Sequence, residues 1–349
     1  MDISPDILFH RYFSELSLEK RKIYRGKLDL TKPPLTGFEQ LLVDIQDVLN
    51  ESLHDANADV GHHAEHSPFH VDYVDSNVEN AIAFRHEDFS FIGLTEPLIN
   101  RLWCVCDSLS RVAVQALQPA LSKPIAPEAI REVLFRVVLF FVVAHEYTHH
   151  VHGHTSRTDS RGITFNEVLS AACNGDLESQ SLEIDADGYA TFLVLRAIVQ
   201  GPARTLSLEL LALELEPKTT QDNVLLSFFI MAVGAFFLSR PAATRTPSNA
   251  YTMEHPLQVV RMNYVVRETH RWCAQDNKPL SEWLTIERLN FLMGIVSEAV
   301  LGSDTTNGWI AQSKFLSSRR GEEYLKNLDQ CRIAHIQSLQ RVDGTSSPA

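Results

Sequence analysis

The sequence predicts an α+β protein that is mostly α-helical and contains one small antiparallel sheet. Helical spacing of apolar residues covers most of the chain from residue 98 to residue 340. Two β-rich runs, residues 81–85 and 89–94, flank a short polar turn, which is the pattern of a hairpin. The 349 residues are 44% hydrophobic and 21% charged. That composition is globular, and the length suits one large domain or two ordinary ones.

The N-terminal part of the chain is predicted to be helical. Residues 5–30 and 37–53 form two expected helices, with Pro33 and Pro34 between them. Residues 54–70 are polar and rich in histidine, which predicts a loop. We therefore expect an N-terminal helical region with a His-rich loop over residues 1–70.

The rest of the chain is predicted to form one domain over residues 71–340, followed by a disordered tail at 341–349. Pro127 opens a helix that is apolar on nearly all sides up to Ala144, which is typical of a buried helix. Residues 155–175 are polar and predict a loop or lid. Other helices are expected at residues 98–117, 177–200, 206–213, 223–239, 256–273, 280–301 and 310–340.

Charge and cysteine usage limit the partners and the compartment. The 31 Lys and Arg residues against 44 Asp and Glu residues give a formal net charge of −13, which argues against nucleic acid as the main partner. The five cysteines show no disulfide framework, and the N-terminus lacks the pattern of a signal peptide. Residues 223–239 carry no charge but are short for a membrane span, so a buried core helix is favoured over that alternative. We expect a soluble cytoplasmic protein.

The strongest chemical signal is the motif H-E-x-x-H at residues 145–149. His145 and His149 are four residues apart on one helical face, so that both imidazoles can bind one tetrahedral zinc ion. Glu146 is placed beside the open position of the metal, where it can take a proton from zinc-bound water. The alternative is a chance match in a chain with 15 histidines. The apolar helix before the motif speaks against chance, because unpartnered polar groups in such a setting are costly.

The metzincin pattern has glycine at position 152 and the third histidine ligand at position 155. This chain has His152 and Thr155 there, so it does not fit that pattern. His150, His152 and His154 are predicted to be surface or second-site histidines. Downstream, Glu183 and Asp187 share a helical face, so one carboxylate can bind zinc while the other orients a ligand histidine. A solvated acidic face is the alternative for this pair. Glu178 lacks an acidic partner four residues on and is the weaker candidate.

Four motifs occur in the order found in one peptidase family. They are N-A-I-A-F at residues 80–84 with F-I-G-L-T at 91–95, H-E-x-x-H at 145–149, E-x-x-A-D at 183–187, and H-P-x4-R-M at 255–262. With these the chain resembles the gluzincins, and most closely the group of CAAX prenyl-protein peptidases and heat-shock membrane zinc peptidases. The resemblance covers residues 75–265 and implies a zincin-like fold. A fainter resemblance is to the soluble phage-exclusion peptidases.

The resemblance also implies roles for individual residues. His145, His149 and Glu183 would bind one Zn²⁺ per chain, with Glu146 as general base. Asp187 would orient a ligand histidine, most simply His145. Arg261 would pair with an active-site carboxylate or with the backbone, and either His255 or Tyr251 would donate to the oxyanion of the tetrahedral intermediate.

The resemblance further implies that residues 80–84 form an edge strand, along which the backbone of a protein or peptide substrate pairs. The membrane relatives carry several long spans, which this chain lacks, so a soluble offshoot of the family is expected.

The sequence therefore predicts a zinc-dependent endopeptidase. One alternative is a zinc-dependent binding or regulatory protein that uses a peptidase fold without turnover, although a purely structural site has no need of Glu146. Another is a transition-metal buffer built from the histidines at 62, 63, 66, 70 and 149–154.

Overall fold

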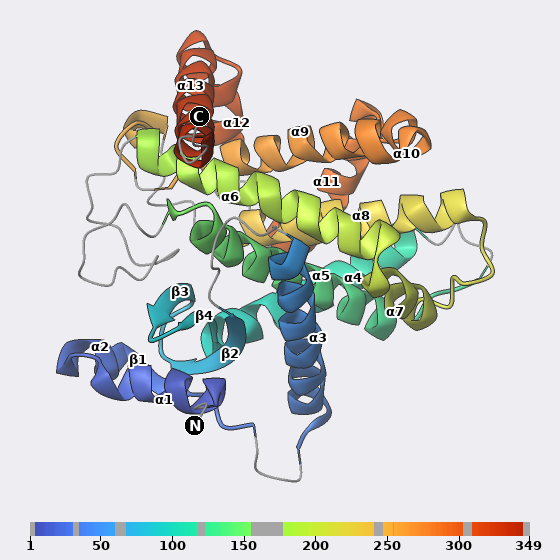
Figure 1. The fold of residues 1–349 in the computed structure, drawn as a ribbon. Helices are drawn as coiled ribbons and strands as arrows, with labels where there is room; N and C mark the ends of the chain where they lie inside the picture. Colours follow the sequence, from blue (N-terminus) through green and yellow to red (C-terminus); the bar gives the residue numbers. More distant parts are fainter. Residues whose placement is uncertain are drawn as a thin grey trace. The chain divides into compact units, whose positions relative to one another are not determined.

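The computed structural model describes residues 4–30, 35–59, 68–117, 123–154, 177–240, 247–253, 255–302 and 309–344. The chain divides into two compact units. Unit 1 comprises residues 1–101, 142–170 and 339–349, and unit 2 comprises residues 102–141 and 171–338. The described part is mostly helical and contains one small four-stranded sheet, which confirms the predicted α+β class. Figure 1 shows the elements with their labels.

The sheet of unit 1 is mixed rather than antiparallel, and in this respect the prediction was wrong. Its strands are β1 (Tyr24–Lys27), β2 (Phe69–Ser76), β3 (Ala81–His86) and β4 (Phe89–Thr95), in the order β1-β2-β4-β3. The predicted hairpin is β3–β4, which is antiparallel and turns through Glu87 at a φ of 51°. Strand β4 lies between β2 and β3, and it pairs with β2 in parallel.

The expected helix at residues 5–30 is three elements, namely α1 (Pro5–Glu15), α2 (Leu18–Ile23) and β1. Ser17 starts α2 afresh by accepting a hydrogen bond from the backbone N–H of Lys20. The chain then leaves the helical conformation, because β1 pairs with β2 and Leu28 donates its backbone N–H to Tyr73. Tertiary pairing here outweighs the local helical pattern.

Helices cover both faces of this sheet. On one face, Phe9 and Phe13 of α1 pack against Phe84 and Phe91 in a buried aromatic cluster. On the other face, the Tyr73 hydroxyl donates to the backbone carbonyl of Leu42 in α3 (Gly37–Asp59). The alternation of side chains along β2 therefore separates an aromatic layer from the layer of α3.

Unit 2 is helical in its described residues. Its longer helices are α4 (Glu96–Leu117), α5 (Pro127–Val151), α6 (Leu177–Leu195), α8 (Lys218–Leu238), α9 (Gln258–Asp276), α11 (Ile286–Leu301) and α13 (Arg319–Gly344), of which α4 and α5 also extend into unit 1. Its shorter ones are the π-helix η3 (Arg196–Gln200), α7 (Pro202–Leu210), the 3₁₀ turn η4 (Pro247–Asn249), α10 (Lys278–Trp283) and α12 (Trp309–Leu316). Helix α6 packs along α9, and α8 packs against α11, α9 and α10.

Helix α8 is the core helix predicted at residues 223–239. Within the described residues it is the one helix long and apolar enough to cross a membrane, and 94% of its most apolar window is buried. Its aromatic side chains pack inward, with Phe236 and Phe237 in edge contact with Phe141 of α5. The burial agrees with a core helix.

Candidate metal centre

The last turns of α5 place two imidazoles side by side. The Nε2 atoms of His145 and His149 are 3.1 Å apart, and both side chains are 1% exposed. A tetrahedral zinc ion with Zn–N bonds of about 2.0–2.1 Å holds two ligand nitrogens about 3.3–3.4 Å apart. The two nitrogens therefore need to move only slightly to share one metal ion. A hydrogen bond between the two rings accounts for the same distance.

The opposite face of the helix end is anchored to the sheet of unit 1. The rings of Tyr147 and His150 lie 4.7 Å and 5.4 Å from the ring of Phe69 on β2. Burial lowers the pKa of His150 to about 4, although the backbone of Phe91 hydrogen-bonds to it, so this imidazole is neutral at pH 7. Because Tyr147 lies about half a turn round the helix from His145 and His149, the two histidines and Tyr147 occupy opposite faces of the helix.

A third imidazole, that of His154, joins this group. Its Nδ1 atom is 3.0 Å from Nδ1 of His149, and its side chain is fully buried. The prediction offered His154 as a surface or a second-site histidine, and a surface position was wrong. We call His145, His149 and His154 the histidine cluster. The carboxylate of Glu146 is also fully buried, on the intervening part of the same helix.

Unit 2 contains a group of buried charges between α6 and α9. The Nε and Nη2 atoms of Arg261 donate to the two carboxylate oxygens of Asp187, each at 2.7 Å. The Nη1 atom of Arg261 is 3.6 Å from Oε2 of Glu183. Arg261 and Asp187 are fully buried and Glu183 is 3% exposed. The arginine thus compensates two carboxylates that burial would otherwise penalise.

His255 completes this group. Its Nδ1 atom is 3.0 Å from Oε2 of Glu183, close enough for a direct polar contact. The sequence predicted His255 as a donor to a substrate oxyanion, and in unit 2 the contact of its Nδ1 atom is with Glu183. We call Glu183, Asp187, His255 and Arg261 the carboxylate cluster.

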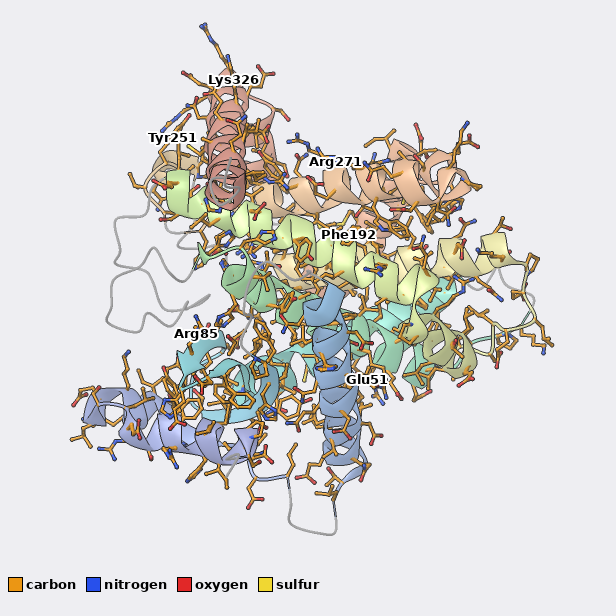
Figure 2. The ribbon with its side chains drawn as sticks, viewed as in Figure 1. Glu51, Arg85, Phe192, Tyr251, Arg271 and Lys326 are labelled. Carbon is orange, nitrogen blue, oxygen red and sulfur yellow. The ribbon has the colours of Figure 1, made fainter. Side chains whose placement is uncertain are left out.

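The other oxyanion candidate, Tyr251, packs elsewhere in unit 2. Its ring is 5.2 Å from the ring of Tyr324 on α13, and it lies beside that helix in Figure 2. Burial raises its pKa, as does nearby Glu323. These contacts place Tyr251 against α13.

The remaining acidic residues of α6 face other partners. Asp185 lies 3.6 Å from Nε of Arg332 on α13, whereas Glu183 and Asp187 contact Arg261 on α9. Asp185 therefore occupies a different face, as helical spacing predicts. Glu178 is exposed in the first turn of α6, and this agrees with its being the weaker candidate.

The predicted histidine-rich surroundings are described only in part. His62, His63, His66 and residues 155–175 lie outside the described residues. His70 lies 3.3 Å from Asp6 and 3.4 Å from Asp72. Lys27 is 2.6 Å from Asp72, so an ammonium group already supplies positive charge at that position.

Sequence reasoning identified the residues of both clusters except His154. The signal that could have found it is Gly153, a typical residue at the end of a helix, which predicts that the chain turns back just before His154. No protein-family model, no curated protein and no solved structure matches this chain. The functional inference therefore depends on the two clusters themselves.

Proposed function

We propose that this protein is a zinc-dependent endopeptidase in which His145, His149 and Glu183 hold one Zn²⁺ and Glu146 is the general base. The observation that carries the proposal is the pair of buried Nε2 atoms, 3.1 Å apart on successive turns of one helix, with a buried glutamate between them in sequence. Two imidazoles and one carboxylate form a donor set that suits catalytic zinc, with one position left for water or substrate.

The chemistry divides between the metal and the chain. Zinc, when bound at such a site, polarises a carbonyl group and lowers the pKa of water. Glu146 takes the proton from the attacking water and passes it to the amine that leaves. Its place next to His145 in sequence keeps the carboxylate close to the ligands without making it one of them.

The carboxylate cluster supports Glu183 in this proposal. The Nδ1 atom of His255 lies 3.0 Å from Oε2 of Glu183, and Arg261 places positive charge 3.6 Å from the same oxygen. These two contacts fix the rotamer of the carboxylate, as outer contacts of metal ligands commonly do. Each oxygen of Asp187 accepts from Arg261 and has a further lone pair, so Asp187 can also accept the N–H of a ligand histidine.

The substrate class we propose is a protein or peptide that adds a strand to the sheet. Strand β3 stands at one end of the strand order, which makes it an edge strand of the described sheet. Pairing through the backbone tolerates many side chains and so suits a peptidase that reads extended segments. The acidic net charge and the buried α8 favour a soluble cytoplasmic enzyme without a nucleic-acid partner.

Metal content tests the first half of the proposal. Elemental analysis of protein purified with zinc present is expected to give about one zinc per chain, and His145→Ala or His149→Ala is expected to lose it. Several weakly held metal ions per chain would favour the metal-buffer alternative. Protein without metal after that purification would contradict the zinc site.

Turnover tests the second half. Glu146→Gln is expected to retain zinc and the fold but to lose peptide hydrolysis by orders of magnitude, because an amide cannot accept the proton. The matched control is Glu132→Gln on the same helix. In the contacts described, the Glu132 carboxylate pairs with Arg136, one turn further along the helix. New peptide termini in a proteome-derived peptide library, read by mass spectrometry, supply the measurement. Zinc without turnover in the unaltered protein would favour the non-catalytic alternative.

A further inference from the structure

We propose that His154 is a positioning residue, which holds His149 in the tautomer and orientation needed for metal binding by accepting a hydrogen bond from its Nδ1–H group. The metal-binding part of this inference rests on the proposed function. The hydrogen bond itself does not, because it is a contact between two side chains of the histidine cluster. The two Nδ1 atoms are 3.0 Å apart, and the ring centroids are 5.0 Å apart at an angle of 69°.

The contact restricts where the protons lie. A neutral imidazole has one N–H donor and one acceptor nitrogen, so exactly one of the two Nδ1 atoms can carry the shared proton. If Nε2 of His149 is to bind a metal, the proton must be on Nδ1 of His149. His154 is then the acceptor and carries its own proton on Nε2. With the proton in that place, the pair holds the form of His149 whose Nε2 faces His145 without a proton.

A local turn brings His154 to this position. Helix α5 ends at Val151, and His152 and Gly153 donate their backbone N–H groups to Thr148 and His150. Gly153 has a φ of 67°, the left-handed conformation that ends many helices and that other residues adopt with strain. The chain reverses there, so the side chain five residues after His149 returns to its ring.

The identity of the partner matters for the charge of the site. Ligand histidines usually donate their second N–H to a carboxylate, a backbone carbonyl or water. Here the acceptor is another imidazole, which is neutral when it accepts. It orients His149 without adding negative charge beside the metal. The carboxylate cluster of unit 2 already contributes two acidic side chains for the same proposed metal.

The side chain of asparagine separates the hydrogen bond from simple packing. Its Oδ1 atom stands at the same distance along the side chain as Nδ1 of histidine and can accept the same proton. His154→Asn is therefore expected to keep the hydrogen bond, whereas His154→Leu fills the space without an acceptor. The matched control is His152→Asn, a partly exposed histidine of the same turn.

The first measurement uses metal-free protein. Long-range ¹H–¹⁵N spectra of protein labelled at histidine are expected to show the proton of His149 on Nδ1 in the unaltered protein and in His154→Asn. In His154→Leu the proton is expected to move at least partly to Nε2. An unchanged tautomer in His154→Leu would overturn the proposed hydrogen bond.

The second measurement is zinc affinity by competition with a chromophoric chelator. His154→Leu is expected to bind zinc about 10–100-fold more weakly, the range found for loss of an outer partner of a ligand histidine. His154→Asn and His152→Asn are expected to stay within about threefold of the unaltered protein. Equal affinity in His154→Leu would overturn the positioning role. If the unaltered protein binds no zinc, the proposed function and the metal-binding part of the inference fail together, and the tautomer measurement alone decides the hydrogen bond.

Discussion

Arg261 on α9 lies beside two buried carboxylates of α6, those of Asp187 and Glu183. It is fully buried, donates two hydrogen bonds to Asp187, and lies within 3.6 Å of Glu183. Its guanidinium also lies 5.0 Å from the centre of the Phe237 ring of α8. A guanidinium stays charged at any ordinary pH and offers a rigid set of donors, which suits a buried site with two carboxylates close together.

Removal of Arg261 is expected to destabilise the protein strongly. Arg261→Met leaves Asp187 and Glu183 as buried carboxylates without their guanidinium, and a broken buried pair typically costs about 3–5 kcal/mol. The control, Arg271→Met on the same helix, removes a 61% exposed arginine that pairs with Glu268 three residues earlier, where about 0–1 kcal/mol is expected. Urea denaturation followed by circular dichroism measures both.

A double variant tests whether the charge pair itself is responsible. Arg261→Met combined with Asp187→Leu removes both partners of the two hydrogen bonds. Its loss of stability is expected to be smaller than the sum of the two single losses, because the second change no longer leaves a buried charge alone. Strict additivity would contradict the coupling between α6 and α9 through this pair.

Two cysteines of one helix differ in reactivity for a physical reason. Cys104 is exposed on α4, whereas Cys106 is 2% exposed and burial raises the pKa of its thiol. Iodoacetamide at pH 8 is expected to label Cys104 readily and Cys106 orders of magnitude more slowly, and mass spectrometry of the labelled peptide gives the ratio. Equal labelling before denaturation would contradict the packing of α4.

At the scale of elements, β4 depends on a glycine at its centre. A Cβ atom at Gly93 would lie 2.7 Å from Cγ2 of Val74 and 2.9 Å from Cγ1 of Ile82, on the two neighbouring strands. Both neighbours are β-branched and therefore stiff, so they cannot turn away easily. The close approach of three strands thus requires glycine at this position.

A pair of glycine substitutions tests this close approach. Gly93→Ala is expected to destabilise by about 1–3 kcal/mol through overpacking. Gly294→Ala on α11 is the matched change, because a Cβ atom there has no atom within 4 Å outside its own helix. It is expected to stabilise by about 0.4–1 kcal/mol by restricting the unfolded chain. Denaturant midpoints of the two variants are expected to move in opposite directions.

Elements with a strong local signal were predictable from the sequence, and those fixed by distant partners were not. Helix α5 follows from its unbroken apolar run and from Pro127, and the β3–β4 hairpin follows from its polar turn. Strand β1 was missed because pairing with β2, about 50 residues later, decides its conformation. The parallel pairing of β2 with β4 was missed for the same reason, since strand order is a tertiary property.

In the candidate site, too, the positions set by local helical spacing were predictable and those set by distant contacts were not. Helical spacing alone predicts that His145 shares a helical face with His149, and Glu183 with Asp187. It also predicts that Asp185 lies on a different face from Glu183 and Asp187. The bidentate contact of Arg261 with Asp187 joins residues 74 apart and was predicted only through a resemblance. The place of His154 depends on the backbone conformation of Gly153, which the residues near it in sequence suggest but do not determine.

For the whole molecule, the burial of α8 can be tested: α8 is the one helix of the described residues long and apolar enough to cross a membrane, and 94% of its most apolar window is buried. Helix α8 spans Lys218–Leu238 and packs against α9, α10 and α11, and two of its aromatic rings contact Phe141 of α5. After cell lysis and carbonate extraction, the full chain is expected in the supernatant, with an integral membrane protein of the same cells as the control. Recovery in the membrane pellet would contradict a core role for α8.

The sequence separation within the carboxylate cluster has a consequence for synthesis on the ribosome. Arg261 is added 74 residues after Asp187, which corresponds to about 4–15 s at 5–20 residues per second. During that interval the acidic residues of α6 have been synthesised, and Arg261, whose guanidinium will pair with them, has not yet been translated. The nascent helix must keep these carboxylates hydrated until α9 is translated. Docking of α6, and with it any capture of metal by Glu183, is therefore a late event in the life of the growing chain.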